Sequence, residues 1–185
     1  MTVTDEPLSP ASAPAAGAPP DAPGASGGLK TRRTWLFYVT ATCVLVLDQL
    51  VKWLVVRDVP YGASTQVLGN LLSFSHRHNT GAAFGLLPSA ALGLAAVAAV
   101  VIVVLVMFGR RVATQSGALL LGISLQLGGA AGNFIDRIRL GYVVDFIDVH
   151  FWPVFNVADI GITCGAVIVV AAILFDPRLR DVGRS

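Results

Sequence analysis

The segment Tyr142–Ile162, YVVDFIDVHFWPVFNVADIGI, carries three aspartates among large apolar residues, namely Asp145, Asp148 and Asp159. A carboxylate removed from water costs free energy unless it is paired, hydrogen-bonded or protonated. Two carboxylates in one partly dry site share a proton, so one can take a proton from water while the other gives one to a peptide oxygen. That is the chemistry of aspartic proteases. Which aspartates can do it depends on the elements that position them.

Asp145 and Asp159 are the candidates for such a pair. Thirteen residues separate them, enough for a loop whose end folds back over the start of an apolar helix. Asn156 precedes Asp159 by three positions, so both side chains lie on one face of that helix. Asp148 is interpreted as a solvated loop carboxylate. Spacing alone does not establish that the two candidates meet, so a purely structural role for them stays open.

The composition indicates a membrane protein. Of the 185 residues, 55% are hydrophobic and 13% are charged, and the mean hydropathy is +0.72. A soluble domain has about 25% charged residues. The net charge of +2 is small and scattered, which argues against a nucleic-acid partner. Cys43 and Cys164 lie in apolar runs without disulfide or zinc spacing and are interpreted as small buried residues.

Four apolar runs are long enough to cross a bilayer, because a helix needs about 20 residues to span ~30 Å of hydrocarbon. The predicted spans cover residues 35–56, 88–108, 116–135 and 154–175, with Pro153 in the first turn of the fourth helix. They predict an all-α membrane protein with one membrane domain, residues 35–176. A short tail, residues 177–185, follows it.

The N-terminal tail, residues 1–34, is expected to be disordered and dispensable for catalysis. Its first 28 residues hold six of the ten prolines, seven alanines and almost no large apolar side chain. Such a segment cannot bury enough surface to offset the entropy lost on ordering. It also lacks the basic start and apolar core of a signal peptide.

The basic residues predict the orientation of the spans. The clusters Lys30–Arg33, Arg110–Arg111 and Arg178–Arg184 stand before the first span, between the second and third, and after the fourth. Four crossings place all three clusters on one side, which the positive-inside rule makes cytoplasmic, together with both termini. The loops 57–87 and 137–153 are then external, and the alternation in LLSFSHRH predicts a strand in the first of them.

The ionisable groups of three spans are predicted at the external interface. Asp159 precedes Phe175 by 16 positions, or roughly 24 Å along its helix. Asp48 and Lys52 fall in the external part of the first span, and Asp136 marks the external end of the third. A proton-coupled transporter would carry such groups near the midplane. The pattern therefore favours an active site at the membrane surface, while a non-catalytic scaffold with packing carboxylates stays open.

Simpler roles are assigned to the polar groups outside the candidate pair. Asp48 and Lys52 are spaced i, i+4, where opposite charges pair on one helix face, so they are interpreted as a structural ion pair. Asp136 and Arg137 suit an interfacial anchor, with the arginine reaching the headgroups. The run Gly128–Gly132 is a small-residue face for close helix packing or for contact with a substrate.

Five motifs together resemble the lipoprotein signal peptidase (signal peptidase II) family. Each motif alone is weak, but all five stand in the family's order relative to the four spans. The resemblance covers residues 35–175 and leaves out the N-terminal tail. The motifs are DQLVK at 48–52, NTGAAFG at 79–85, GGAAGNFIDR at 128–137, VVDFI at 143–147 and FNVAD at 155–159.

The resemblance implies an aspartic endopeptidase of the bacterial inner membrane, active at the extracytoplasmic face. Such enzymes remove the signal peptide from diacylglyceryl-modified prolipoproteins, cutting on the amino side of the lipobox cysteine. The family's dyad corresponds to Asp145 and Asp159, which leaves Asp136 as a supporting residue. A β-cradle and a short helix on the outer face, no metal or organic cofactor, and inhibition by globomycin are also implied. Lipid-modified prolipoproteins and phospholipid are the expected partners of a chain expected to be monomeric.

Physical roles can also be assigned to the remaining motif residues. Asn133 and Asn156 are expected to hydrogen-bond the dyad or the substrate backbone. Arg137 is expected to bind substrate carbonyls or lipid headgroups through its planar fork. Asn79 is expected to align the substrate strand, with Gly81 leaving room for close backbone approach. The resemblance assigns the shared proton to neither aspartate.

His76, Arg77 and His78, directly before Asn79, are not explained by the resemblance. The two histidines share one strand face and could hold a metal, but no third ligand stands at a suitable spacing. Contact with anionic lipid and simple solvation both stay open for these three side chains.

Overall fold

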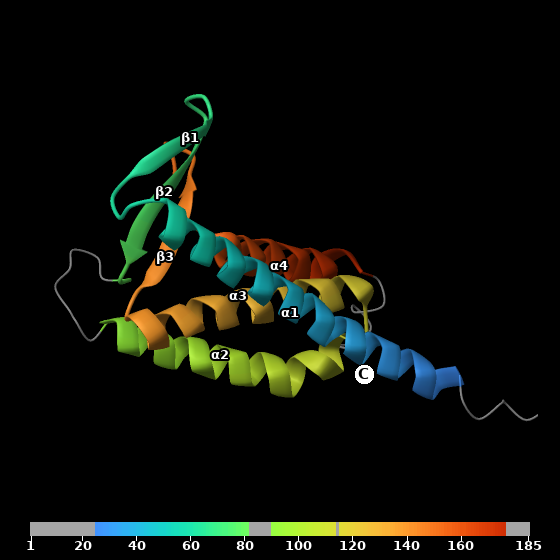
Figure 1. Cartoon of the computed structure of the whole chain (residues 1–185). Helices are drawn as coiled ribbons and strands as arrows, with labels where there is room; N and C mark the ends of the chain where they lie inside the picture. Colours follow the sequence, from blue (N-terminus) through green and yellow to red (C-terminus); the bar gives the residue numbers. More distant parts are fainter. Residues whose placement is uncertain (1–24, 82–89, 114, 177–185) are drawn as a thin grey trace, which may run out of the picture.

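The computed structural model describes residues 25–81, 90–113 and 115–176. Figure 1 shows a bundle of helices with a small sheet at one end. In chain order the elements are α1 (Ala25–Asp58), β1 (Ser64–Leu68), β2 (Leu72–Asn79), α2 (Ala90–Ala113), α3 (Gly117–Leu140), β3 (Val143–Asp148) and α4 (Val157–Phe175). All four helices are long and apolar enough to cross a membrane, which confirms the predicted four-span organisation.

The helices differ in their ends from the predicted spans. α1 begins at Ala25, inside the predicted tail, because a membrane helix can continue past the hydrocarbon into its polar flank. Residues 1–24 of that tail lie outside the described part of the chain. α3 continues to Leu140, beyond the predicted end of the third span at residue 135. Asp136 and Arg137 therefore lie within the helix and not after it.

The fourth helix starts later than predicted, and Pro153 is not in its first turn. α4 begins at Val157 after the N-cap residue Asn156. The preceding Phe155 is held instead by backbone hydrogen bonds to Ile147 of β3, so the chain is extended there. The expectation that Cys43 and Cys164 are buried is also wrong, because both are exposed on outward-facing helix surfaces.

The strands form an antiparallel sheet in the order β1-β2-β3. β2 contains most of LLSFSHRH, so the predicted strand is confirmed. Its pairing with β3 places Arg77 opposite Asp145 and Asn79 opposite Val143. Two segments far apart in sequence, NTG and VVDF, are thereby brought side by side. The short helix expected beside the sheet is not seen in the described residues, and segment 82–89 lies outside them.

α3 is the central helix of the bundle. It packs against α1, α2 and α4, and 56% of its membrane span is buried, compared with 6% for α2. Glycines allow this close approach: a Cβ at Gly128 would collide with the Ala41 carbonyl oxygen of α1, and one at Gly129 with the Ala158 carbonyl oxygen of α4. The small-residue run therefore serves helix packing, one of the two roles predicted for it.

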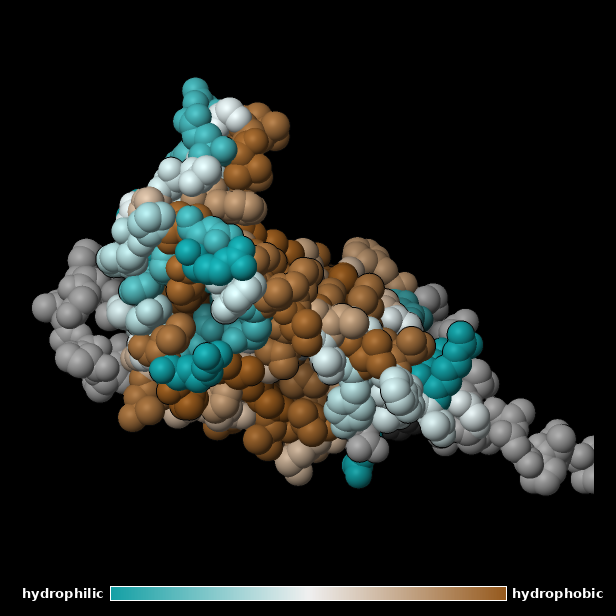
Figure 2. Space-filling model, viewed as in Figure 1, coloured by the Kyte–Doolittle hydropathy of each residue, from teal (hydrophilic) through white to brown (hydrophobic). Residues whose placement is uncertain are grey.

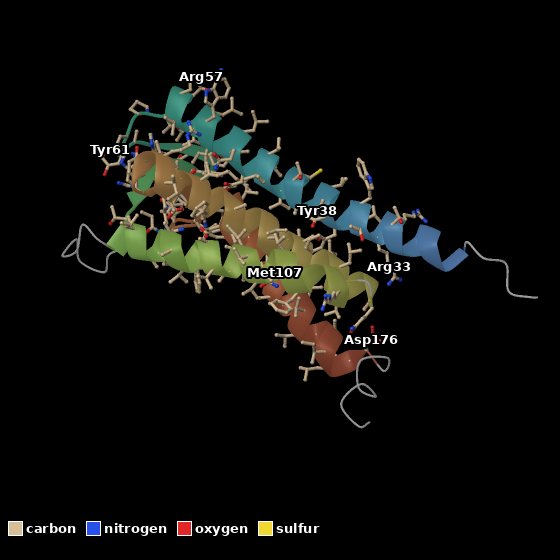
Figure 3. All side chains as sticks on the ribbon, turned by 90° about the horizontal axis from the view of Figure 1, so that it is seen from below. Arg33, Tyr38, Arg57, Tyr61, Met107 and Asp176 are labelled. Carbon is tan, nitrogen blue, oxygen red and sulfur yellow. The ribbon has the colours of Figure 1, made fainter. Side chains whose placement is uncertain are left out.

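The two ends of the bundle have different interiors. The apolar core contains Phe37 of α1 and Leu119 and Ile123 of α3, near the end where α3 begins. The buried polar residues, by contrast, gather near the sheet. In Figure 3 the labels Arg57 and Tyr61 mark the sheet end, and Arg33 and Asp176 the opposite end. Figure 2 shows a hydrophobic belt over the helices and hydrophilic residues around the sheet.

Candidate active site

Asp145 lies on β3, pointing into the end of the bundle, and is 3% exposed. Each of its carboxylate oxygens accepts a hydrogen bond from an asparagine side chain. Asn79 Nδ2 donates to Oδ2 at 2.9 Å, and Asn156 Nδ2 donates to Oδ1 at 2.7 Å. The strand pairing of β2 with β3 supplies the first donor and the start of α4 supplies the second, so three elements converge on one carboxyl group.

Burial raises the pKa of the Asp145 carboxyl from 3.8 to about 6. The hydrogen bonds from Asn79 and Asn156 and the positive charge of Lys52 act in the opposite direction, whereas the nearby Asp159 raises the pKa further. A carboxyl group with a pKa near neutrality can both hold and release a proton at physiological pH. This property suits general acid–base catalysis.

Asp159 is the third residue of α4 and forms a reciprocal cap with Asn156. Its backbone N–H donates to Asn156 Oδ1 at 2.9 Å, and its Oδ2 accepts from the Asn156 backbone N–H at 3.2 Å. This capping box satisfies two N–H groups that a helix start leaves without intrahelical partners. The same contacts fix the direction in which the Asp159 carboxylate points.

Two buried asparagines connect the aspartates. Asn156 donates to Asp145 and caps Asp159, so one side chain touches both. Asn133 of α3 donates from Nδ2 to Asp159 Oδ1 at 2.8 Å and accepts from Asn156 Nδ2 at 3.2 Å. Asp145 and Asp159 are thus brought into one hydrogen-bonded cluster, as the aspartic-protease hypothesis requires.

A second polar cluster lies beside the aspartates and joins α1 to α3. Lys52 forms the predicted ion pair with Asp48 at 2.8 Å and a second one with Asp136, also at 2.8 Å. Asp136 further accepts from the Val144 backbone N–H at 3.2 Å, which ties α3 to β3. Because Asp136 is 4% exposed and bonded to Lys52, Gln49 and the Val144 backbone, it is not the interfacial anchor that was one prediction for it.

Gln49 is a member of this second cluster that sequence reasoning missed. Its Nε2 donates to Asp136 Oδ1 at 2.9 Å and lies 3.3 Å from the Gly132 carbonyl oxygen. The available signal was a polar residue between Asp48 and Lys52 within a membrane span, where polar groups without partners are costly.

Arg137 and Gly81 flank the cluster without contacting either carboxylate in the described structure. Arg137 Nη1 donates to the Asn133 carbonyl oxygen at 3.2 Å, while its buried Nε has no partner among the described residues. Gly81 has φ +70° and donates its N–H to Asn79 Oδ1 at 2.8 Å. That backbone conformation favours glycine, and the bond sets the orientation of the Asn79 amide.

Asp148 is not the solvated loop carboxylate that was expected. It ends β3 and accepts hydrogen bonds from the His150 backbone N–H at 2.9 Å and from Ser75 Oγ at 3.0 Å. These contacts, the backbone one above all, hold the pKa of the Asp148 carboxyl below its usual range. Its partners are Ser75 of the central strand β2 and the His150 backbone, not Asp145 or Asp159.

The histidines before Asn79 belong to an aromatic cluster rather than to a solvated surface. His78 stacks on Tyr142 with ring centroids 3.7 Å apart and lies 4.2 Å from Tyr61. The two histidine Nε2 atoms are 3.3 Å apart, and His76 Nδ1 lies 2.9 Å from the Val59 carbonyl oxygen. Among the described residues no metal-binding group of three or more such ligands occurs.

Two open grooves meet at Asp159. One, of about 430 Å³, runs along α4 below the segment that carries Phe151 and Trp152. The other, of about 310 Å³, lies among α2, α3 and α4 and also contains Asn133 and Arg137. Both are lined mainly by apolar side chains, so an apolar molecule in the bilayer can reach a carboxylate at the sheet end.

The comparisons with known proteins agree with this geometry. Residues 40–175 match the family described as signal peptidase (SPase) II. The chain belongs to the signal peptidase II family. It is therefore a multi-pass membrane aspartic protease. Asp145 and Asp159, which Asn156 joins by hydrogen bonds to both, are the candidate dyad of that activity.

Relatives of the signal peptidase II family cover most of the chain. A lipoprotein signal peptidase of Moorella thermoacetica is 40% identical over 132 residues, 71% of this chain and 88% of its own. The lipoprotein signal peptidase of Mycolicibacterium smegmatis is 38% identical over an alignment that covers 98% of this chain and 78% of its own. A bacterial membrane enzyme solved in meso at 1.9 Å superposes with a TM-score of 0.71 at 33% identity, covering 76% of this chain and 93% of its own.

Proposed function

We propose that this peptidase removes the signal peptide from diacylglyceryl-modified prolipoproteins, cutting on the amino side of the lipobox cysteine, with Asp145 and Asp159 as the catalytic pair. The observation that carries the proposal is the bridge made by Asn156, which donates to Asp145 at 2.7 Å and caps Asp159 at 2.9 Å. Two carboxyl groups from different elements are thereby held together beside grooves open to lipid.

The two aspartates divide the proton transfers between them. Asp145 is the more deeply buried, and burial favours the protonated form, so it donates the first proton to the scissile carbonyl oxygen. Asp159 borders both grooves, and its carboxylate takes a proton from the water that attacks the carbonyl carbon. When the tetrahedral intermediate collapses, Asp159 gives that proton to the leaving amine, and a hydroxyl group of the intermediate returns a proton to Asp145 as the new carboxyl group forms. No charge accumulates on the pair, because each proton taken up is returned.

The surroundings suit a lipid-bearing peptide. The apolar grooves take the acyl chains and the apolar signal segment, and Arg137 of one groove offers a polar group to an unwound lipobox. Asn79 and Gly81, exposed beside Asp145, offer further polar groups. Arg137 suits a carbonyl or headgroup oxygen, because its buried Nε is a donor with no partner among the described residues. A single chain contains the whole cluster, so we propose a monomeric enzyme that also contacts phospholipid.

We further propose that the sheet end is extracytoplasmic and both termini are cytoplasmic. The basic cluster at the start of α1 lies at the end opposite the sheet, as Arg33 does in Figure 3, and the positive-inside rule places such clusters in the cytoplasm. A topology reporter inserted at Ser64 of β1 is expected to give an external signal. A cytoplasmic signal there would reverse the orientation.

The catalytic assignment is tested by measuring cleavage of a purified diacylglyceryl-modified prolipoprotein in detergent. Asp145→Asn and Asp159→Asn are each expected to abolish cleavage, because either change leaves one proton transfer without its carboxyl group. Asp148→Asn is the matched control, since it removes a neighbouring carboxylate that contacts neither aspartate. Wild-type cleavage by either dyad variant would refute the assignment and favour a packing role for the carboxylates.

The substrate class is tested with the same prolipoprotein before lipid modification. Cleavage of the unmodified form at the rate of the modified form would mean that the grooves do not recognise the acyl chains. The expected result is cleavage of the modified form only, and globomycin is expected to block it.

A further inference from the structure

Lys52 is a buried ammonium group whose three protons are all engaged. It is 3% exposed, and its Nζ lies 2.8 Å from Asp48 Oδ2, 2.8 Å from Asp136 Oδ2 and 3.0 Å from Asn133 Oδ1. The first two contacts are ion pairs with carboxylates. The third contact, with Asn133, lies on the side of the catalytic pair. A lysine that served only as an ion-pair partner would not need this contact.

The contact with Asn133 decides which way its amide faces. An asparagine amide presents an acceptor on one side and a donor on the other, and the two can exchange by rotation. An ammonium group can only donate, so the atom that faces Lys52 must be the carbonyl oxygen. The NH₂ group of Asn133 must then face Asp159, to which it donates at 2.8 Å.

The other two asparagines of the site have their orientations set by the backbone. Asn79 Oδ1 accepts from the Gly81 N–H at 2.8 Å, and Asn156 Oδ1 accepts from the Asp159 N–H at 2.9 Å. Asn133 differs, because its oxygen accepts from Lys52 at 3.0 Å and, at a longer 3.2 Å, from Asn156. The amide oxygens of Asn79 and Asn156 are thus oriented by backbone N–H donors, whereas that of Asn133 is oriented by the charged Lys52 side chain.

We propose that Lys52 is a positioning residue of the catalytic pair: its ammonium group holds the Asn133 amide with its N–H toward Asp159. The donor on Asp159 then keeps that carboxylate oriented for the attacking water. This inference rests on the proposed function, since it assigns Asp159 a role in the reaction. Asp48 and Asp136 hold Lys52 in place, and Asp48 also accepts from the Ala158 N–H of α4 at 2.9 Å.

The test compares full-length proteins in an Asp48→Asn parent. Adding Lys52→Gln to this parent leaves the total charge of the wild-type cluster unchanged, because one negative and one positive group have been removed. Glutamine can donate or accept, so the Asn133 oxygen loses its charged donor and keeps only the longer, neutral contact from Asn156, which holds the amide less firmly. Relative to the parent, kcat for the diacylglyceryl-modified prolipoprotein is expected to fall on the order of 10²-fold, as small misplacements at an active site do. KM is expected to stay the same, because buried Lys52 does not meet the substrate.

A double-mutant cycle with Asn133→Ala separates positioning from general support. If Lys52 acts through Asn133, the loss caused by Lys52→Gln disappears once Asn133 is alanine. Equal losses with and without Asn133 would overturn the inference, as would a Lys52→Gln protein with the kcat of its parent. If the Asp48→Asn, Lys52→Gln double variant does not fold, a second pair of proteins replaces it. Asp136→Asn is then the parent, and the effect of adding Lys52→Gln to it is measured in the same way.

The two proposals fail in distinguishable ways. If Asp159→Asn still cleaves the substrate, the catalytic assignment is wrong whatever Lys52 does. If Asp159→Asn is inactive and Lys52→Gln leaves the parent kcat unchanged, only the positioning role of Lys52 is wrong.

Discussion

Asn156 Nδ2 lies 2.7 Å from Asp145 Oδ1, although the two residues belong to different elements and are eleven positions apart in the chain. The oxygen of the same amide caps α4 at the Asp159 N–H. Helix capping and the joining of two carboxyl groups are therefore performed by one side chain. The position of Asp145 relative to Asp159 depends on where α4 begins.

Substitutions of Asn156 can separate its two tasks. Asn156→Ser keeps an oxygen that can cap α4 but removes the donor to Asp145, whereas Asn156→Ala removes both. Both variants are expected to lose most cleavage activity, and the alanine variant is expected to be less stable by about 1 kcal/mol, the usual value of an N-cap. Thermal unfolding in detergent and cleavage assays check this. Wild-type cleavage by Asn156→Ser would show that the amide contact is not needed.

The raised pKa of Asp145 predicts a pH dependence of stability. A folded-state pKa of about 6, above the usual 3.8, means that the folded protein binds this proton more tightly than the unfolded chain does. The resulting stabilisation is fully present below pH 3.8 and is lost as the pH rises through 6. The loss is on the order of 3 kcal/mol, since one pKa unit corresponds to about 1.4 kcal/mol.

Comparison with Asp145→Asn isolates this effect, because the amide cannot ionise. As the pH rises from 4 to 7, the Tm of the wild type is expected to fall relative to that of the variant. Parallel Tm curves for the two proteins over this range would contradict the shifted pKa.

Asn79 is predicted to control the proton affinity of Asp145. Its Nδ2 donates to Asp145 Oδ2 at 2.9 Å and lowers the pKa of that carboxyl, so Asn79→Ala should raise it further above 6. With Asp145 as the acid, the limb on which kcat/KM falls with rising pH moves to higher pH. Asn70→Ala, in the exposed turn between β1 and β2, is the control and should leave the profile unchanged. An Asn79→Ala profile that coincides with the wild type would argue against this coupling.

Close contact between α3 and α4 is predicted to be necessary for the geometry of the site. A Cβ at Gly129 would collide with the Ala158 carbonyl oxygen, directly before Asp159. Gly129→Ala is therefore expected to destabilise the protein by about 1–3 kcal/mol, as overpacking usually does, and to reduce kcat by displacing α4. Thermal unfolding and cleavage rates check both effects.

Gly93→Ala in α2 is the matched control for Gly129. A Cβ there has open space around it, so the variant should be as stable as the wild type or more stable by up to about 1 kcal/mol, the helix preference of alanine over glycine. Equal behaviour of the two variants would show that helix spacing at Gly129 does not control the site.

The sequence by itself determined the four membrane spans and the family. Spans are local properties, since a bilayer requires about 20 apolar residues in a row whatever their neighbours are. The strand of β2 could be predicted for the same reason, because alternation is local. The spacing of Asn156 and Asp159 predicts one helix face for both, whereas Asn156 stands before the helix as its N-cap and meets Asp159 in a reciprocal cap.

Only the tertiary structure decided which polar groups meet. Asn79 and Asp145 are 66 positions apart and meet because β2 pairs with β3, and Asn133 meets Lys52 because glycines let α3 approach α1 closely. Such contacts depend on how elements pack, which no local pattern of residues encodes. For this reason Lys52 could be predicted as a partner of Asp48, four positions away, while its contact with Asn133, 81 positions away, became visible only in the folded chain.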